Sequence, residues 1–64
     1  MSPAEWDRRI IKSRRLFAER RRVGDAQSVA GAETELALLK QLLALDIVPE
    51  AMRAKVQNLI VRNG

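Results

Sequence analysis

Four basic side chains in the N-terminal third of the chain follow one helical spacing. They are Arg8, Lys12, Arg15 and Arg22. Steps of four, three and seven residues place them along one face of a helix, over roughly 21 Å at a rise of 1.5 Å per residue. Guanidinium and ammonium groups neutralise phosphates and carboxylates. The spacing therefore predicts a surface that binds an anionic macromolecule.

The net positive charge of the chain lies in its first 23 residues. The first 23 residues contain eight Lys or Arg and three acidic residues, whereas the remainder contains four and five. Some of these bases have a structural explanation, since Arg9 can pair with Glu5 one helical turn earlier. Arg8, Lys12 and Arg15 are instead like-charge neighbours, which costs about 0.2–0.5 kcal/mol per contact. A face that weakens its own helix favours a partner of opposite charge.

Side chains that usually perform catalysis or hold metals are scarce. The chain has no His and no Cys, so the common general base, the usual zinc and iron ligand sets and any disulfide are missing. Glu33 and Glu35 diverge by roughly 200° on a helix. The hydroxyl groups have no evident base beside them; they belong to Ser2, Ser13, Ser28 and Thr34. We expect a protein that is not an enzyme and binds no metal or cofactor.

Two kinds of partner fit the basic face. Nucleic acid is slightly favoured, because Lys and Arg bind phosphates without reading sequence. The alternative is an acidic protein surface, with the chain acting as a modulator or inhibitor that docks on a larger host protein or transcription regulator, of the kind that phages and plasmids encode. Arg15 would then be a central anchor, joined by Trp6 if that side chain is exposed. Core packing is the more frequent role of such a tryptophan.

Other interpretations are less favoured. A helix-turn-helix reader around residues 46–48 would offer few outward side chains on its second helix, namely Arg53, Lys55 and Gln57. A membrane-surface helix would expose an apolar stripe that the core needs. No apolar run approaches the roughly 20 residues of a membrane span, and the start lacks a signal-peptide core, so a cytoplasmic protein is expected.

Three helices would position these side chains. We expect them in a single all-α domain, over about residues 3–23, 28–45 and 49–62. Ser2 and Glu5 form a capping-box pattern at the first start, and Gly24 suits a left-handed cap at its end. Asp25 or Ser28 can each cap the second helix.

Apolar residues at helical spacing predict the core. The first helix offers Trp6, Ile10, Ser13, Phe17 and Arg20. The second offers Val29, Ala32, Leu36, Leu39 and Leu43. The third offers Met52, Val56, Leu59 and Asn63, with Ile60 beside them. These stripes predict an antiparallel hairpin of the first two helices with a short third helix.

The second helix carries another line of leucines about 100° from the first, formed by Leu38, Leu42 and Leu45. One facing helix cannot cover both lines. A chain of 64 residues is also near the size at which a lone core becomes marginal. We therefore expect a homodimer in which this helix from each subunit builds the core of a bundle.

Overall fold

The computed structural model describes residues 2–64, whose regular elements are all helices. Helix α1 spans Pro3–Arg22, α2 spans Ala26–Ala44 and α3 spans Glu50–Asn63. At the start of α1, the Ser2 hydroxyl accepts the backbone N–H of Glu5 over 3.4 Å, and Pro3 occupies the first turn. The Glu5 carboxylate accepts from that same hydroxyl, so the expected cap is present in a variant form.

The turn from α1 to α2 depends on a glycine and an aspartate. Gly24 has φ +68°, the left-handed conformation that glycine adopts without steric cost, as the sequence predicted. The Asp25 carboxylate then accepts the backbone N–H of Ser28 over 2.7 Å. Asp25 is therefore the N-cap, and α2 begins at Ala26, two residues before the expected start.

The connection from α2 to α3 is held by its own contacts. Asp46 adopts φ +57°, which aspartate tolerates better than most residues. Its carboxylate pairs with the guanidinium of Arg53, whose Nε also donates to the carbonyl of Val48 over 3.3 Å. Val48 itself is buried. The segment that the sequence treated as a plain connection thus contributes a core residue and fixes the start of α3.

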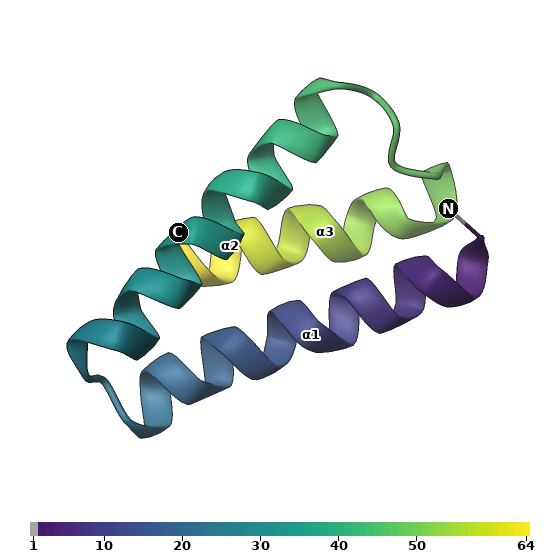
Figure 1. Cartoon of the computed structure of the whole chain (residues 1–64). Coiled ribbons are helices and arrows are strands. Elements are labelled where there is room, and N and C mark those ends of the chain that lie inside the picture. The colour runs from purple at the N-terminus through teal and green to yellow at the C-terminus, as the bar shows by residue number, and fades with distance from the viewer. Residues whose placement is uncertain (1) are drawn as a thin grey trace.

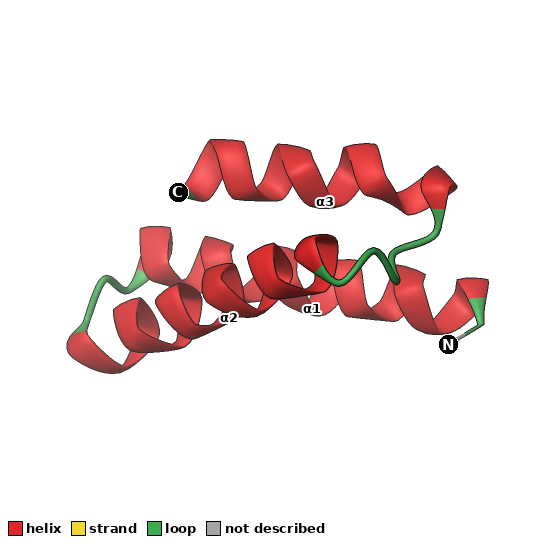
Figure 2. Ribbon diagram, turned by 90° about the horizontal axis from the view of Figure 1, so that it is seen from above, coloured by secondary structure: helices red, strands yellow, loops and turns green. Residues whose placement is uncertain are grey.

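The helices form two layers. Figure 1 shows α2 running back from the end of α1 and diverging from it, while α3 runs in the same direction as α1. Seen from above, α1 and α2 overlap and α3 lies in a layer of its own (Figure 2). Helix α3 contacts both others, and the whole measures 33 × 21 × 16 Å.

The core lies where the three helices meet. Its buried apolar residues are Trp6, Ile10, Phe17, Ala32, Leu39, Val48, Val56 and Leu59, and Leu36, Leu42, Leu43, Met52 and Ile60 pack half-buried against them. Ser13 and Asn63 are also buried, as their place in the stripes predicted. Trp6 is 3% exposed. The idea that Trp6 anchors a partner is therefore wrong, because its indole ring fills the core.

The second line of leucines divides. Leu42 packs against the core of its own chain, whereas Leu38 is 38% exposed and Leu45 is 60% exposed. Leu42 therefore belongs to the core of its own chain, in which α2 contacts both α1 and α3. Across residues 2–64, no helix combines the length and apolarity needed to cross a membrane.

Candidate anion-binding surface

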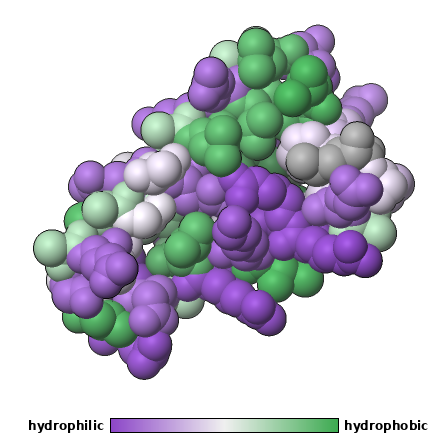
Figure 3. Space-filling model, in the orientation of Figure 1, coloured by the Kyte–Doolittle hydropathy of each residue, from purple (hydrophilic) through white to green (hydrophobic). Residues whose placement is uncertain are grey.

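One side of α1 carries the basic residues predicted from the sequence. Arg8, Lys12, Arg15 and Arg22 are all exposed and form what we call the outer face. The buried residues of α1 lie on its opposite side, against α2 and α3. Figure 3 shows hydrophilic side chains spread over much of this helix. The core on one side of α1 thus orients the outer face toward solvent.

The bases of the outer face are not equivalent. Arg22 pairs with Glu19 over 2.6 Å, one turn earlier on the same helix. Both side chains are largely exposed, so this ion pair contributes little stability. Within residues 2–64, no carboxylate lies within ion-pair distance of Arg8, Lys12 or Arg15. These three are the bases of the outer face whose charge the fold leaves unpaired.

On the side of α1 that faces α2, the arginine has a carboxylate partner. Arg9 Nη2 lies 2.6 Å from Glu35 Oε1, and the Ser13 hydroxyl donates to Glu35 Oε2 over 2.5 Å. The Arg9 side chain is 15% exposed and that of Glu35 is 5% exposed. The predicted pair of Arg9 with Glu5 is therefore wrong. The burial of Glu35 against α1 supplies a better partner, and the pairing neutralises both groups in the interior.

Sequence reasoning missed Glu35 as part of the core. Glu35 follows Ala32 by three residues and precedes Leu39 by four, so it lies on the inner stripe of α2 between two buried residues. Its position could have predicted a buried ion pair, because an acid on an apolar stripe requires a buried partner. Ser13 holds the matching place on α1. The pair links the two helices at one register.

A second basic cluster surrounds a hollow between α1 and α3. Arg14 and Arg21 come from α1, seven residues apart, and Arg62 comes from α3. The hollow has a volume of about 300 Å³. Phe17, Ala18, Leu59 and Asn63 complete its lining. These arginines were not predicted from the sequence, although Arg14 and Arg21 lie seven residues apart beside the core stripe of α1.

Near this hollow, Arg20 ties α1 to the end of α3. Its Nη2 donates to the backbone carbonyl of Asn63 over 3.0 Å, and its guanidinium lies 5.9 Å from the centre of the Phe17 ring. The carbonyl belongs to the last turn of α3, where a cation is favourable. Arg20 is therefore a packing residue, in keeping with its predicted place on the inner stripe.

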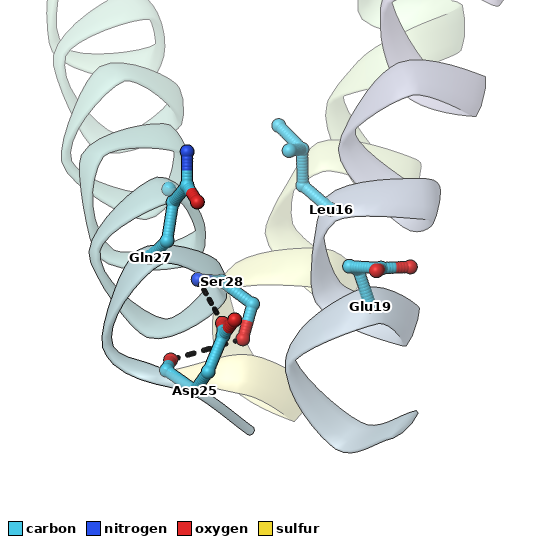
Figure 4. Close-up of a pocket in the computed structure, with 6 residues that line it drawn as sticks. Leu16, Glu19, Asp25, Gln27 and Ser28 are labelled. Carbon is cyan, nitrogen blue, oxygen red and sulfur yellow. Dashed lines mark hydrogen bonds between the residues drawn. The ribbon is translucent and has the colours of Figure 1, made fainter. Parts of the chain in front are cut away.

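Another hollow, of about 240 Å³, lies beside the start of α2. Figure 4 shows Leu16 and Glu19 of α1 facing Gln27 and Ser28, with Asp25 below them. The N–H of Ser28 holds the pKa of Asp25 below its ordinary value, since it donates to the carboxylate. Glu19 is already paired with a base of the outer face. Both acids thus have structural partners, and no base lines this hollow.

Chemistry of other kinds finds little support in the described chain. Residues 2–64 contain no group of three or more acidic side chains close enough to hold a metal ion. Comparisons of the chain with protein families, with curated proteins and with solved structures find no match. What the protein does must accordingly be inferred from the basic surfaces themselves.

Proposed function

We propose that this is a small, non-enzymatic regulatory protein that binds nucleic acid through the outer face of α1. The observation that carries the proposal is the unpaired charge of Arg8, Lys12 and Arg15. These side chains are exposed on one face of a rigid helix and have no carboxylate partner within residues 2–64. Phosphates would supply the missing negative charge.

Three acids of the chain pair with other bases. Glu35, Glu19 and Asp46 each pair with an arginine that is not among the three unpaired bases of the outer face. The three unpaired bases repel one another and gain only from an external anion. Each phosphate contact releases counterions. The logarithm of the binding constant therefore falls linearly with the logarithm of the salt concentration, with a slope of about −0.9 per contact on duplex DNA.

Binding through this face should be largely independent of sequence. Helix α1 contains neither Asn nor Gln, the residues that pair with adenine edges. Its arginines remain as possible guanine contacts, but a row spread over roughly 21 Å suits the phosphate backbone better. The protein would thus coat or modulate nucleic acid rather than select one site.

The proposal is tested by fluorescence anisotropy on two duplexes of unrelated sequence. Arg8→Gln and Arg15→Gln should each weaken binding to both duplexes by a similar factor, because each removes one phosphate contact. Lys40→Gln is the matched control, since Lys40 is exposed on α2 and its loss changes the net charge equally. Affinity that does not depend on salt, or an equal loss in the control, would rule out the outer face as the binding surface.

An acidic protein surface is the competing partner for the same face. Its case is weakened because Trp6 is buried, which leaves the interface without an aromatic anchor on α1. Affinity purification from the native cell, with and without nuclease, separates the two partners. Recovery of one stoichiometric protein after nuclease treatment would favour the protein target, and loss of all partners would favour nucleic acid.

We also propose that two copies of the chain associate through α2. Leu38 and Leu45, seven residues apart, are exposed, and Ile47 follows them at 56% exposure. Figure 3 shows hydrophobic side chains gathered over the C-terminal half of α2. In this dimer α1 and α2 of each chain would form an antiparallel hairpin, with α2 facing the second copy. A second copy suits this face because Thr34 and Gln41, its polar members, carry no charge to repel their equivalents.

Light scattering tests the dimer. Leu38→Glu should convert it to a monomer, since the carboxylate would be buried against its own equivalent. Ala37→Glu is the control, because Ala37 is exposed on another side of α2. Leu42 is a poorer choice, as its substitution would also disturb the core. A wild-type protein that is monomeric and unfolds cooperatively contradicts the dimer.

A further inference from the structure

The hollow between α1 and α3 concentrates positive charge around a small space. Arg14, Arg21 and Arg62 line it, and no acidic residue does. None of these three arginines pairs with a carboxylate within residues 2–64. Arg62 is favourable for the dipole of α3, in whose last turn it lies. The same explanation covers Arg21, in the last turn of α1, but not Arg14, which also lines the hollow from α1.

A buried acceptor lies in the wall of the hollow. The Asn63 side chain donates through Nδ2 to the carbonyl of Leu59 over 2.8 Å, but its Oδ1 has no partner among the described residues. Asn63 is 8% exposed. Because this Oδ1 is closed off from solvent, recognition of a ligand in the hollow rests on the three arginines.

The charge and size of the hollow favour one phosphate class. A phosphodiester within a strand carries one negative charge, whereas a phosphate monoester carries about −1.5 to −2 at neutral pH. Three unpaired guanidinium groups match the more highly charged group. A volume of about 300 Å³ is at the lower end for ligand sites and accommodates one phosphorylated unit at a chain end.

We propose that this hollow binds a phosphate monoester at the end of a nucleic-acid strand. Arg14, Arg21 and Arg62 would contact the phosphate. The assignment rests on the proposed binding of nucleic acid by the outer face, which lies on the same helix. Nucleic acid held along α1 would place its phosphorylated end beside the hollow.

The test compares two short single-stranded DNAs of one sequence, one with a phosphate at its 5′ end and one with a hydroxyl group there. Fluorescence anisotropy should show binding of the phosphorylated strand that is about tenfold tighter, since hydrogen bonds to a charged phosphate are stronger than those to a neutral hydroxyl group. Arg62→Gln should abolish this preference. Arg15→Gln, on the outer face, should weaken both strands equally and preserve the preference.

A second variant closes the hollow without removing an arginine. Ala18 is exposed on α1 and lines the hollow, so Ala18→Glu would place a carboxylate among the three guanidinium groups. It should abolish the preference and leave the helical circular dichroism unchanged, because Glu favours helices and gains arginine neighbours at helical spacing.

Three other results would overturn either the terminal-phosphate site or the proposed function. Equal affinity of wild type for the two strands, with salt-dependent binding intact, would overturn the terminal-phosphate site and leave the proposed function standing. Failure to bind either strand or a duplex would overturn the proposed function itself. A stronger preference for a phosphoserine peptide over its unphosphorylated form than for the phosphorylated DNA end would overturn the assignment to nucleic acid.

Discussion

Two neighbouring positions on α1 give the same amino acid opposite tasks. Arg9 lies against α2, where its guanidinium donates to Glu35, and the Ser13 hydroxyl donates to the same carboxylate. Arg8, one residue earlier, is exposed and has no carboxylate partner within residues 2–64. Richness in arginine therefore says little by itself. The partner that each arginine finds decides whether it holds the fold or remains available for a ligand.

The difference also separates stability from binding. A charge neutralised in the interior contributes to the fold only while its partner is present. A charge repelled by its neighbours at the surface opposes the fold slightly and gains from an external anion. Substitutions on the two sides of α1 should accordingly change different measurements.

The largest effect is expected from Glu35→Ala. It would leave Arg9, whose side chain is 15% exposed, without its carboxylate and remove one of the two acceptors of the Ser13 hydroxyl, the other being the Arg9 carbonyl. Breaking a buried pair in this way should lower the free energy of unfolding by about 3 kcal/mol, measured by urea denaturation followed by circular dichroism. For a domain of this size, that is a large part of the total.

A double variant shows whether the loss comes from the orphaned charge. Replacing both partners by apolar residues, Arg9→Met with Glu35→Leu, should recover most of the stability, because no buried charge then lacks a partner. A change of less than about 0.5 kcal/mol in the single variant, as surface substitutions give, would mean that the pair does not hold α1 to α2.

The opposite sign is expected on the outer face. Combining Arg8→Gln, Lys12→Gln and Arg15→Gln removes like-charge contacts one turn apart, so the free energy of unfolding should rise by a few tenths to about 1 kcal/mol. The gain should shrink at high salt, which screens exposed charges. Clear destabilisation of this variant in the same urea titration would show that the three bases have a structural role.

The smallest effect concerns the cap of α2. The N–H of Ser28 lowers the pKa of Asp25 below its ordinary value, so the ionised carboxylate stabilises the folded chain at pH values above that ordinary pKa. This contribution should be lost as the pH falls through the lowered pKa. Asp25→Asn keeps a cap that does not titrate. Thermal unfolding of the two proteins from neutral to acid pH should therefore converge at low pH, and a constant difference would contradict the assignment.

The sequence alone predicted much of the fold, because helical spacing is a local property. The stripe from Trp6 to Phe17, the cap at Ser2 and the left-handed Gly24 all depend on neighbours in the chain. What it could not predict depends on contacts across the fold. The pairing of Arg9 with Glu35 spans 26 residues, and the covering of Leu42 depends on how α3 lies against α2.

The candidate site was predictable to a similar extent. The exposure of the outer face follows from its position opposite the apolar stripe of α1. The hollow between α1 and α3 does not follow, because it joins Arg14 and Arg21 to Arg62 from the other end of the sequence. Spacing along one helix reveals a row of charges, but only the packing of two helices reveals a pocket.

The central claim is that the outer face of α1 binds phosphates. It is tested most directly by the salt dependence of duplex binding in the wild type and in the combined Arg8→Gln, Lys12→Gln and Arg15→Gln variant. At about −0.9 per phosphate contact, loss of three contacts should make the slope of log K against log salt shallower by about 2.7. Identical slopes in the two proteins would show that these bases do not contact nucleic acid and would contradict the account.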